Sequence, residues 1–241
     1  FVNAEVGSWE THLAYTDVKV VTQSTNKVFG LSSGSLFSID KRDYSVETYS
    51  KVTGLNDNGI SLIQYSDSDE ALFVVYKNAN IDLITSNGIY NLPDLKKKTI
   101  TGSKNINNIC FKDGFAYLSS DFGILKVNVN KKEFSDTYII GENATNVVVK
   151  GVCFWNDSIY ATTATNIYAA KTSKNLSNYE NWNVSLNIPE SGVENLSILS
   201  FDNKLFLLKA NGKLYVKDQQ ETNDWVLFTS DEILSMNISQ G

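Results

Sequence analysis

The stretch FKDGFAYLSSDFGILKVNV, residues 111–129, contains the pattern that decides the fold. A polar turn at Lys112-Asp113-Gly114 leads into the apolar run 115–118, and a second polar break leads into the run 124–127. Short runs of branched and aromatic residues between Asp, Gly and Ser are typical of paired antiparallel strands. The stretch therefore predicts two neighbouring strands of one sheet.

The same pattern recurs along the chain, at KVFGLSSGSLFSID, ALFVVYKNANIDLI, SIYATTATNIYAA and KLFLLKANGKLYV. The aromatic residues that anchor the copies lie 44, 44, 43 and 46 residues apart, at Phe29, Phe73, Tyr117, Tyr160 and Phe206. A period in the low forties that is built from short strands is typical of propeller blades. We therefore predict an all-β fold, a β-propeller of four-stranded antiparallel blades.

The repeat runs from end to end without a break in composition, so we predict a single domain over residues 1–241. The expected repeats cover residues 16–53, 54–100, 101–145, 146–190 and 191–230. A further first strand is expected over 232–237, and residues 9–15 are interpreted as an orphan outer strand that joins the ends of the ring. Five visible repeats indicate an incomplete ring or one part of a longer protein. A solenoid of strands has shorter coils, and a β-sandwich does not explain the even spacing.

The overall charge argues against a nucleic-acid partner. The formal net charge is −6 and the sequence pI is about 4.9, whereas phosphate binding needs a basic surface. The one basic run, residues 96–98, is interpreted as a solvated loop. The sequence contains no stretch of the roughly 20 apolar residues that a membrane helix needs, so we predict no direct membrane insertion. The start lacks a signal peptide and an initiator Met, which we interpret as a mature or trimmed product.

Histidine and cysteine chemistry is not indicated. His12 is the one histidine, and no Gly-x-Ser-x-Gly elbow accompanies it, so a catalytic triad is not predicted. Cys110 and Cys153 each lie seven residues before an anchor, where the fifth repeat has Leu199. This register indicates an apolar core position for both thiols rather than a disulfide or a zinc site.

Most carboxylates that lie between first and second strands are interpreted as turn residues, because Asp stabilises turns through its own backbone. These are Asp67, Asp69, Glu70, Asp113, Asp157 and Asp202. Carboxylates from distant loops that converge in one pocket would instead suit a glycan-cleaving propeller enzyme, which stays open as a third hypothesis. No catalytic, cofactor-binding or metal-binding residue is predicted, and no cofactor is expected.

The blade pattern resembles the two-component-regulator propeller repeats of Bacteroidota. A longer set of motifs is similar to the N-terminal propellers of the PorZ family of type IX secretion components. These motifs are SWETHLAY, YSKVTGLNDNGISLIQYS, NANIDLI, IYNLPDLKKKTITG, INNICF, GFAYLSSDFGILKVN and DTYIIG. The resemblance covers most of residues 8–141, and its motifs are structural, so no functional residue is carried over.

The resemblance implies a non-enzymatic, exported scaffold in the periplasm or at the outer-membrane surface. It would bind other secretion proteins, such as a sortase-type component, or further parts of its own longer chain. The alternative is the periplasmic ligand-sensing propeller of a hybrid two-component sensor kinase.

Overall fold

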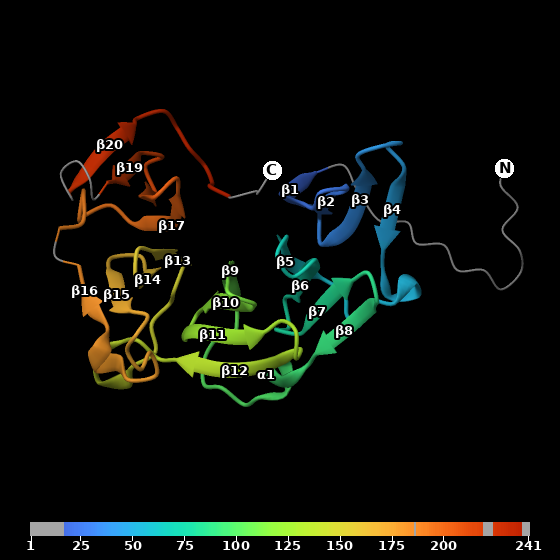
Figure 1. Cartoon of the computed structure of the whole chain (residues 1–241), viewed down its shortest axis with the longest axis horizontal. Coiled ribbons are helices and arrows are strands. Elements are labelled where there is room, and N and C mark those ends of the chain that lie inside the picture. Colours follow the sequence, from blue (N-terminus) through green and yellow to red (C-terminus); the bar gives the residue numbers. More distant parts are fainter. Residues whose placement is uncertain (1–16, 186, 219–223, 238–241) are drawn as a thin grey trace, which may run out of the picture. The chain divides into compact units, whose positions relative to one another are not determined.

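The computed structural model describes residues 17–185, 187–218 and 224–237. Its twenty strands form five four-stranded antiparallel sheets, and each sheet contains four strands that are consecutive in the chain (Figure 1). The five sheets correspond to the five predicted repeats, so the prediction of an all-β chain of four-stranded antiparallel blades is confirmed. The chain divides after Lys96 into two compact units. The single domain over 1–241 stays a prediction.

The first unit contains two sheets whose first strands are neighbours. Thr22 Oγ1 of β1 accepts a hydrogen bond from the backbone N–H of Tyr65 in β5, at 3.1 Å, and the ring of Tyr65 stacks on Phe29 with 5.7 Å between ring centres. The strands of these sheets are β1 (Val18–Gln23), β2 (Lys27–Ser32), β3 (Ser35–Asp40), β4 (Val46–Tyr49), β5 (Ile60–Ser66), β6 (Ala71–Tyr76), β7 (Ile81–Thr85) and β8 (Gly88–Leu92).

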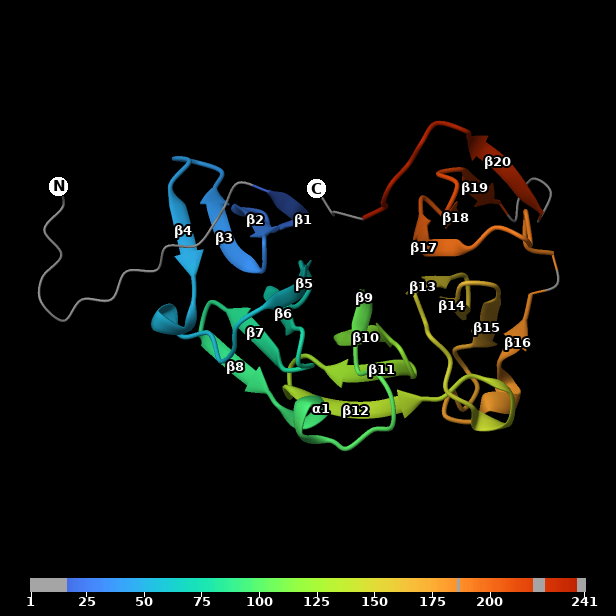
Figure 2. The same ribbon diagram turned by 180° about the vertical axis from the view of Figure 1, so that it is seen from behind.

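The second unit contains three sheets, and its first strands β9, β13 and β17 are again neighbours in that order. Figure 2 shows the same arrangement of these sheets from behind. Their strands are β9 (Ile106–Lys112), β10 (Phe115–Ser120), β11 (Gly123–Asn128), β12 (Glu133–Tyr138), β13 (Gly151–Trp155), β14 (Ser158–Thr162), β15 (Ile167–Lys171), β16 (Asn183–Val184), β17 (Asn195–Phe201), β18 (Lys204–Lys209), β19 (Leu214–Lys217) and β20 (Trp225–Thr229).

The turn residues of the sequence produce the hairpins that join these strands. Lys112 pairs with Phe115, so the turn between β9 and β10 has two residues, Asp113 and Gly114, with φ of 52° and 76°. Two positive φ values match the right-handed twist of the flanking strands, and they favour Gly and Asp. Gly123 is required for a different reason, since a Cβ atom there would lie 2.3 Å from the carbonyl oxygen of Tyr138.

The anchor aromatics of the first three repeats are buried, and those of the last two are half-buried. Phe29 belongs to a core cluster of the first unit, and Tyr117 belongs to the cluster between the sheets β9–β12 and β13–β16. At about 25 cal/mol per Å² of buried apolar surface, such contacts are the main source of stability in stacked sheets. A blade is therefore stable because its neighbour covers the apolar face.

Some predicted elements differ from the structure. Residues 232–237 form no strand. The backbone N–H of Ile233 donates to the carbonyl of Gly212, and no strand in the described part of the chain pairs with the segment. A short helical turn, η1 (Lys51–Thr53), follows β4, and Ser50 provides its N-cap. The other short helices are α1 (Asp94–Lys97), η2 (Glu142–Ala144) and η3 (Tyr179–Asn181). The predicted orphan strand over 9–15 lies outside the described residues.

Candidate functional site

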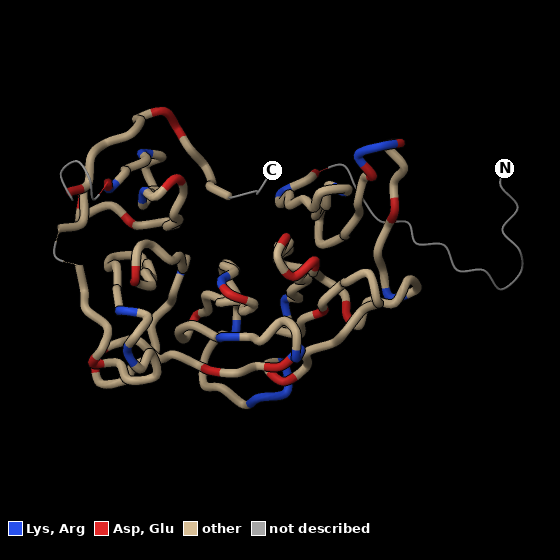
Figure 3. The backbone as a smooth tube through the Cα atoms, in the orientation of Figure 1, with Lys and Arg blue, Asp and Glu red and all other residues tan. Residues whose placement is uncertain are grey.

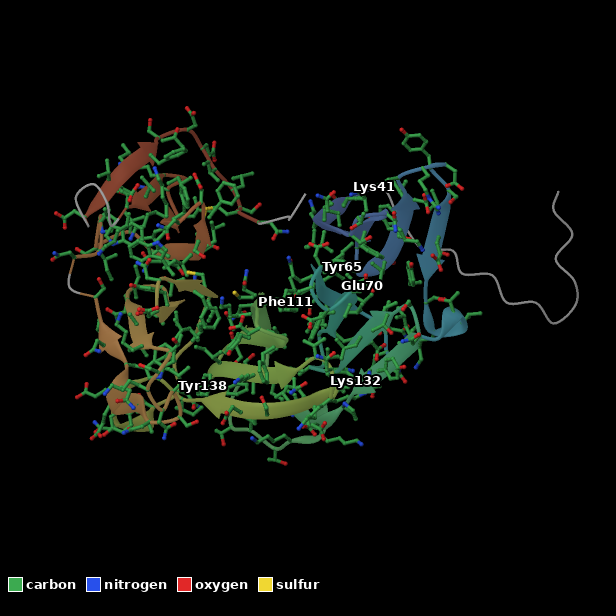
Figure 4. The ribbon with its side chains drawn as sticks, viewed as in Figure 1. Lys41, Tyr65, Glu70, Phe111, Lys132 and Tyr138 are labelled. Atoms are coloured by element: carbon green, nitrogen blue, oxygen red, sulfur yellow. The ribbon has the colours of Figure 1, made fainter. Side chains whose placement is uncertain are left out.

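A pocket of about 270 Å³ lies in the second unit, against one face of the β9–β12 sheet. Figures 1 and 2 both show the connection between β15 and β16 beside the end of β12, and this connection forms the opposite wall. Figure 4 shows Tyr138 at that end of β12. The lining residues come from three places in the sequence: Tyr117, Lys126, Asp136 and Tyr138 from the sheet, Phe154 from β13, and Thr172, Lys174, Asn175, Leu176 and Ser177 from the connection.

Three lining residues form one row across the sheet. Tyr117 of β10 pairs with Lys126 of β11, and Lys126 pairs with Asp136 of β12. Directly opposed residues of neighbouring strands point to the same face, and so do residues two apart on one strand, which places Tyr138 beside the row. Strand pairing therefore brings a phenol, an ammonium group and a carboxylate to one wall of the pocket.

The opposite wall is fixed by hydrogen bonds rather than by strand pairing. The Nε1 of buried Trp182 donates to the carbonyl oxygen of Leu176 at 3.0 Å. Ser177 Oγ donates to Asp136 Oδ1 at 3.3 Å and so joins the connection to the sheet. These contacts hold the segment 172–177 against the β9–β12 sheet.

Aromatic rings surround the ammonium group of Lys126. Its Nζ lies 3.9 Å from the ring centre of Phe115 and 5.7 Å from that of Tyr117. Phe154 packs edge-on against Tyr117, with 4.7 Å between ring centres and 67° between the planes. A cation over aromatic faces is held by the ring quadrupoles, worth about 0.5–1 kcal/mol at an exposed site.

The two phenols of the pocket are hydrogen-bond donors at neutral pH. Burial raises the pKa of Tyr117 to about 12, and the carboxylates of Asp113 and Asp136 add to the effect. Burial also raises the pKa of Tyr138, as does the nearby carboxylate of Asp136. Both hydroxyls therefore keep their protons, and the pocket offers groups that bind rather than a nucleophile paired with a base.

A second polar cluster, in the first unit, is fully occupied by its own hydrogen bonds. Asp82 of β7 is completely buried. Its Oδ2 accepts from the backbone N–H of Asn56 at 2.8 Å and from the hydroxyl of Tyr76 at 2.5 Å. Its Oδ1 accepts from Nδ2 of Asn56 at 3.0 Å and from Nδ2 of Asn91 at 2.8 Å. The carboxylate thus holds the segment before β5 to the sheet and has a structural role.

The two cysteines occupy equivalent positions, as their register predicts: Cys153 is buried in the core, and Cys110 packs half-buried against it. Cys110 lies opposite Tyr117, Cys153 opposite Tyr160, and Leu199 opposite Phe206. Both thiols are free. Burial raises the pKa of Cys110 to about 12 and raises that of Cys153 as well, which makes both thiols poor nucleophiles.

The carboxylates predicted in turns lie in turns between first and second strands, as Asp113 and Asp202 show with φ of 52° and 47°. No group of three or more His, Cys, Asp or Glu residues in the described part of the chain could hold a metal ion. His12 lies outside the described residues. The basic run 96–98 is exposed, as predicted, but its first two residues end the short helix α1 rather than lie in a loop. Lys96 Nζ lies 2.6 Å from Oδ2 of Asp57.

Charged residues of both signs are interspersed within each unit (Figure 3). Large apolar side chains are exposed on the last described sheet, where Phe201 is 60% exposed, Phe228 62% and Val226 49%. Phe228 also packs edge-on against Phe206. No helix among the described residues is long and apolar enough to cross a membrane.

Comparison with known proteins identifies the family. The model of the PorZ N-terminal β-propeller domain of the type IX secretion system matches residues 28–183. The chain belongs to the PorZ N-terminal β-propeller family. The resemblance seen in the sequence is thereby confirmed, although a search of curated proteins finds no match.

The solved structure of PorZ from Porphyromonas gingivalis is 26% identical, with a TM-score of 0.82 over 93% of this chain. That protein is described as an essential bacterial surface component of the type IX secretion system. The chain spans 30% of the length of that PorZ chain.

Two more distant structures show the propeller fold alone. The WD40 propeller of Doa1 is 15% identical, with a TM-score of 0.63 over 87% of this chain and 67% of its own. The extracellular domain of the one-component system BT4673 from B. thetaiotaomicron is 13% identical, with a TM-score of 0.63 over 95% of this chain and 31% of its own.

Proposed function

We propose that this chain is a non-enzymatic, exported propeller domain that serves as a scaffold for protein–protein contacts in the type IX secretion machinery. The observation that carries the proposal is the PorZ family match over residues 28–183, together with 26% identity to a PorZ described as a surface component of that system. In this proposal the domain works in the periplasm or at the outer-membrane surface, and it docks a sortase-type component.

The exposed apolar side chains of the last sheet support a contact surface. Phe201 and Phe228 are each more than half exposed, and exposed apolar patches on a protein surface mark sites of interaction with other proteins. We assign this surface to a further part of the same longer chain, because the matched PorZ chain is more than three times as long as the segment that aligns with it.

Recovery of the sortase-type component from native envelopes tests the scaffold role. The full-length protein is compared with a version that lacks residues 1–241, at equal amounts of bait in the envelope. We expect recovery to fall at least about tenfold, which corresponds to about 1.4 kcal/mol of binding free energy. Equal recovery would overturn the proposal.

A pair of point substitutions tests the contact surface without deleting the domain. In the full-length protein, Phe201→Ser with Leu227→Ser removes two exposed apolar side chains of the last sheet, since Leu227 of β20 is 45% exposed. Val52→Ser is the control at a site of the first unit that is 64% exposed. If the surface binds the rest of the chain, the double variant becomes more sensitive to proteolysis after residue 230, and the control does not. Equal sensitivity of both variants would contradict the assignment.

The ligand-sensing propeller of a hybrid sensor kinase stays the alternative. The likeness to BT4673 extends to the fold alone, at 13% identity, and does not favour this alternative. The coding sequence beyond residue 241 distinguishes the two, since a kinase predicts a membrane helix followed by a histidine kinase domain.

A further inference from the structure

The pocket of the second unit breaks the pattern of the repeat at one position. The residue paired with each anchor aromatic on the third strand is uncharged in four of the five sheets: Ser38, Leu83, Ala169 and Val216. In the β9–β12 sheet this position is Lys126. The other sheets show that the fold does not need a charge at this place.

Lys126 also lacks the partner that strand pairing offers. Asp136 lies directly opposite on β12, yet no ion pair within 4 Å joins the two among the described residues. The ammonium group lies over the rings of Phe115 and Tyr117, and Asp136 accepts a hydrogen bond from Ser177. The cation at the pocket wall is therefore not neutralised from within the described chain.

The phenol hydroxyls of the pocket also lack a partner within the described chain. Neither Tyr117 nor Tyr138 has a hydrogen-bond partner for its hydroxyl within the described residues, although both side chains are largely buried. In the described part of the chain, Ser119 Oγ is the one fully sealed side-chain oxygen or nitrogen without a partner. The two hydroxyls are thus accessible, and they open into the pocket that they line.

The lining of this pocket contains more cations than carboxylates. Lys126, Lys174 and the two phenols can each donate to a guest, whereas Asp136 is the single carboxylate of the lining. Hydrogen bonds from charged donors to a carboxylate are about twice as strong as those between neutral groups. The volume of about 270 Å³ is below the range of about 300–1,000 Å³ of drug-sized sites and fits a guest of one sugar or one amino acid.

We propose that this pocket binds a small molecule that carries a carboxylate, with Lys126 and the hydroxyls of Tyr117 and Tyr138 as its recognition groups. The carboxylate lies at Lys126, and the ring faces and Phe154 contact the apolar part of the guest. Asp136, on the same wall, accepts from a hydroxyl or an ammonium group of the guest. A sugar acid and an acidic amino acid share this chemistry.

Titration of the 241-residue chain followed by two-dimensional NMR and calorimetry tests the proposal. The probes are glucuronate, glutamate and glucose, each up to about 20 mM, a range that detects a Kd of about 1 mM or 4 kcal/mol of binding. We expect at least one carboxylate to bind and to shift the signals of Tyr117 and Tyr138, and glucose to bind at least tenfold more weakly. Tighter binding of glucuronate identifies a sugar acid, and tighter binding of glutamate identifies an amino acid.

Matched variants locate the site. Lys126→Met keeps most of the length of the side chain and removes the charge, so it should raise the Kd at least tenfold. Tyr138→Phe should raise it about threefold. Lys171→Met is the control, because Lys171 is an exposed lysine of the same unit that does not line the pocket. No binding of either carboxylate, or equal binding by wild type and Lys126→Met, would overturn the proposal.

Discussion

The two polar clusters of this chain differ in how their hydrogen bonds are satisfied. Around Asp82, four donors of the protein meet two carboxylate oxygens, and no accessible surface is left on the acid. In the pocket, an ammonium group and two phenols face open space without an intramolecular acceptor among the described residues. Both clusters lie on propeller sheets, so the fold alone does not set the difference. Polar groups that are satisfied internally stabilise the fold, and groups left open are available to a ligand.

The largest effect is expected from Asp82→Ala. The substitution leaves the buried hydroxyl of Tyr76 without its acceptor and removes the hydrogen bonds that Asn56 and Asn91 donate to the carboxylate, so the free energy of unfolding should fall by about 2–4 kcal/mol. Urea unfolding measures this change. Asp67→Ala, in a turn, is the control, with an expected change within about 0.5 kcal/mol. A loss below about 1 kcal/mol for Asp82→Ala would contradict the structural role assigned to the Asp82 cluster.

A smaller loss is expected from Trp182→Phe, which acts on the wall of the pocket. The substitution removes the hydrogen bond to the carbonyl of Leu176 and part of a buried side chain, at a cost of about 1–2 kcal/mol. Carboxylate binding should weaken along with stability, because the segment 172–177 loses its support. Tyr179→Phe in the same connection is the control. Unchanged stability and unchanged binding would show that Trp182 does not hold the wall.

The pH dependence of the segment near Asp82 provides a third test. Hydrogen bonding from Lys96, and then from Asn78 and Asn80, lowers the pKa of Asp57 to about 2. Because this pKa is below the unfolded value of about 3.9, Asp57 stabilises the fold above pH 4 and loses this contribution as the pH falls toward 2. The side chain of its partner Lys96 is 43% exposed and is screened by solvent, so the effect is at most about 1 kcal/mol.

Urea unfolding of wild type and Asp57→Asn between pH 6 and 2.5 measures the effect. The difference between the two proteins should be largest at the upper end of this range and should shrink below pH 4. A difference that stays constant over the range would mean that Asp57 does not titrate with the fold.

The smallest effect on stability is expected from Lys126→Met. The substitution removes a cation without an ion-pair partner and keeps the aliphatic contact with the rings of Phe115 and Tyr117, so the free energy of unfolding should change by less than about 0.5 kcal/mol. Thermal unfolding of wild type and variant measures it. A loss above about 2 kcal/mol would place Lys126 among the groups that hold the fold.

The fold could be predicted because the same pattern of apolar strand residues recurs every 43 to 46 residues along the sequence. Phe29, Tyr117 and the other anchors mark the second strands, and the register that relates Cys110 to Cys153 is present in the sheets. The further strand predicted at the end of the repeats is absent from the structure. Residues 232–237 have the composition of a strand, but no described strand pairs with them, and pairing rather than composition decides strand formation.

The pocket and the Asp82 cluster were not predicted, for a physical reason. Asp82 and Lys126 each lie within an otherwise apolar strand, where a single charge is typical of a solvent-facing position. Burial of Asp82 depends on Asn56, 26 residues away, and the pocket depends on a connection that belongs to the next repeat. One sequence without related chains contains no signal for such distant contacts.

One paired measurement tests the contrast between the two clusters most directly: the melting temperature and the carboxylate Kd of wild type, Asp82→Asn and Lys126→Met, taken on the same samples. Asp82→Asn should melt several degrees lower and keep its Kd, because its cluster holds the fold. Lys126→Met should keep its melting temperature and lose at least tenfold in affinity. If both variants lose stability and neither changes the Kd, the open polar groups of the pocket have no ligand of this class, and the account is contradicted.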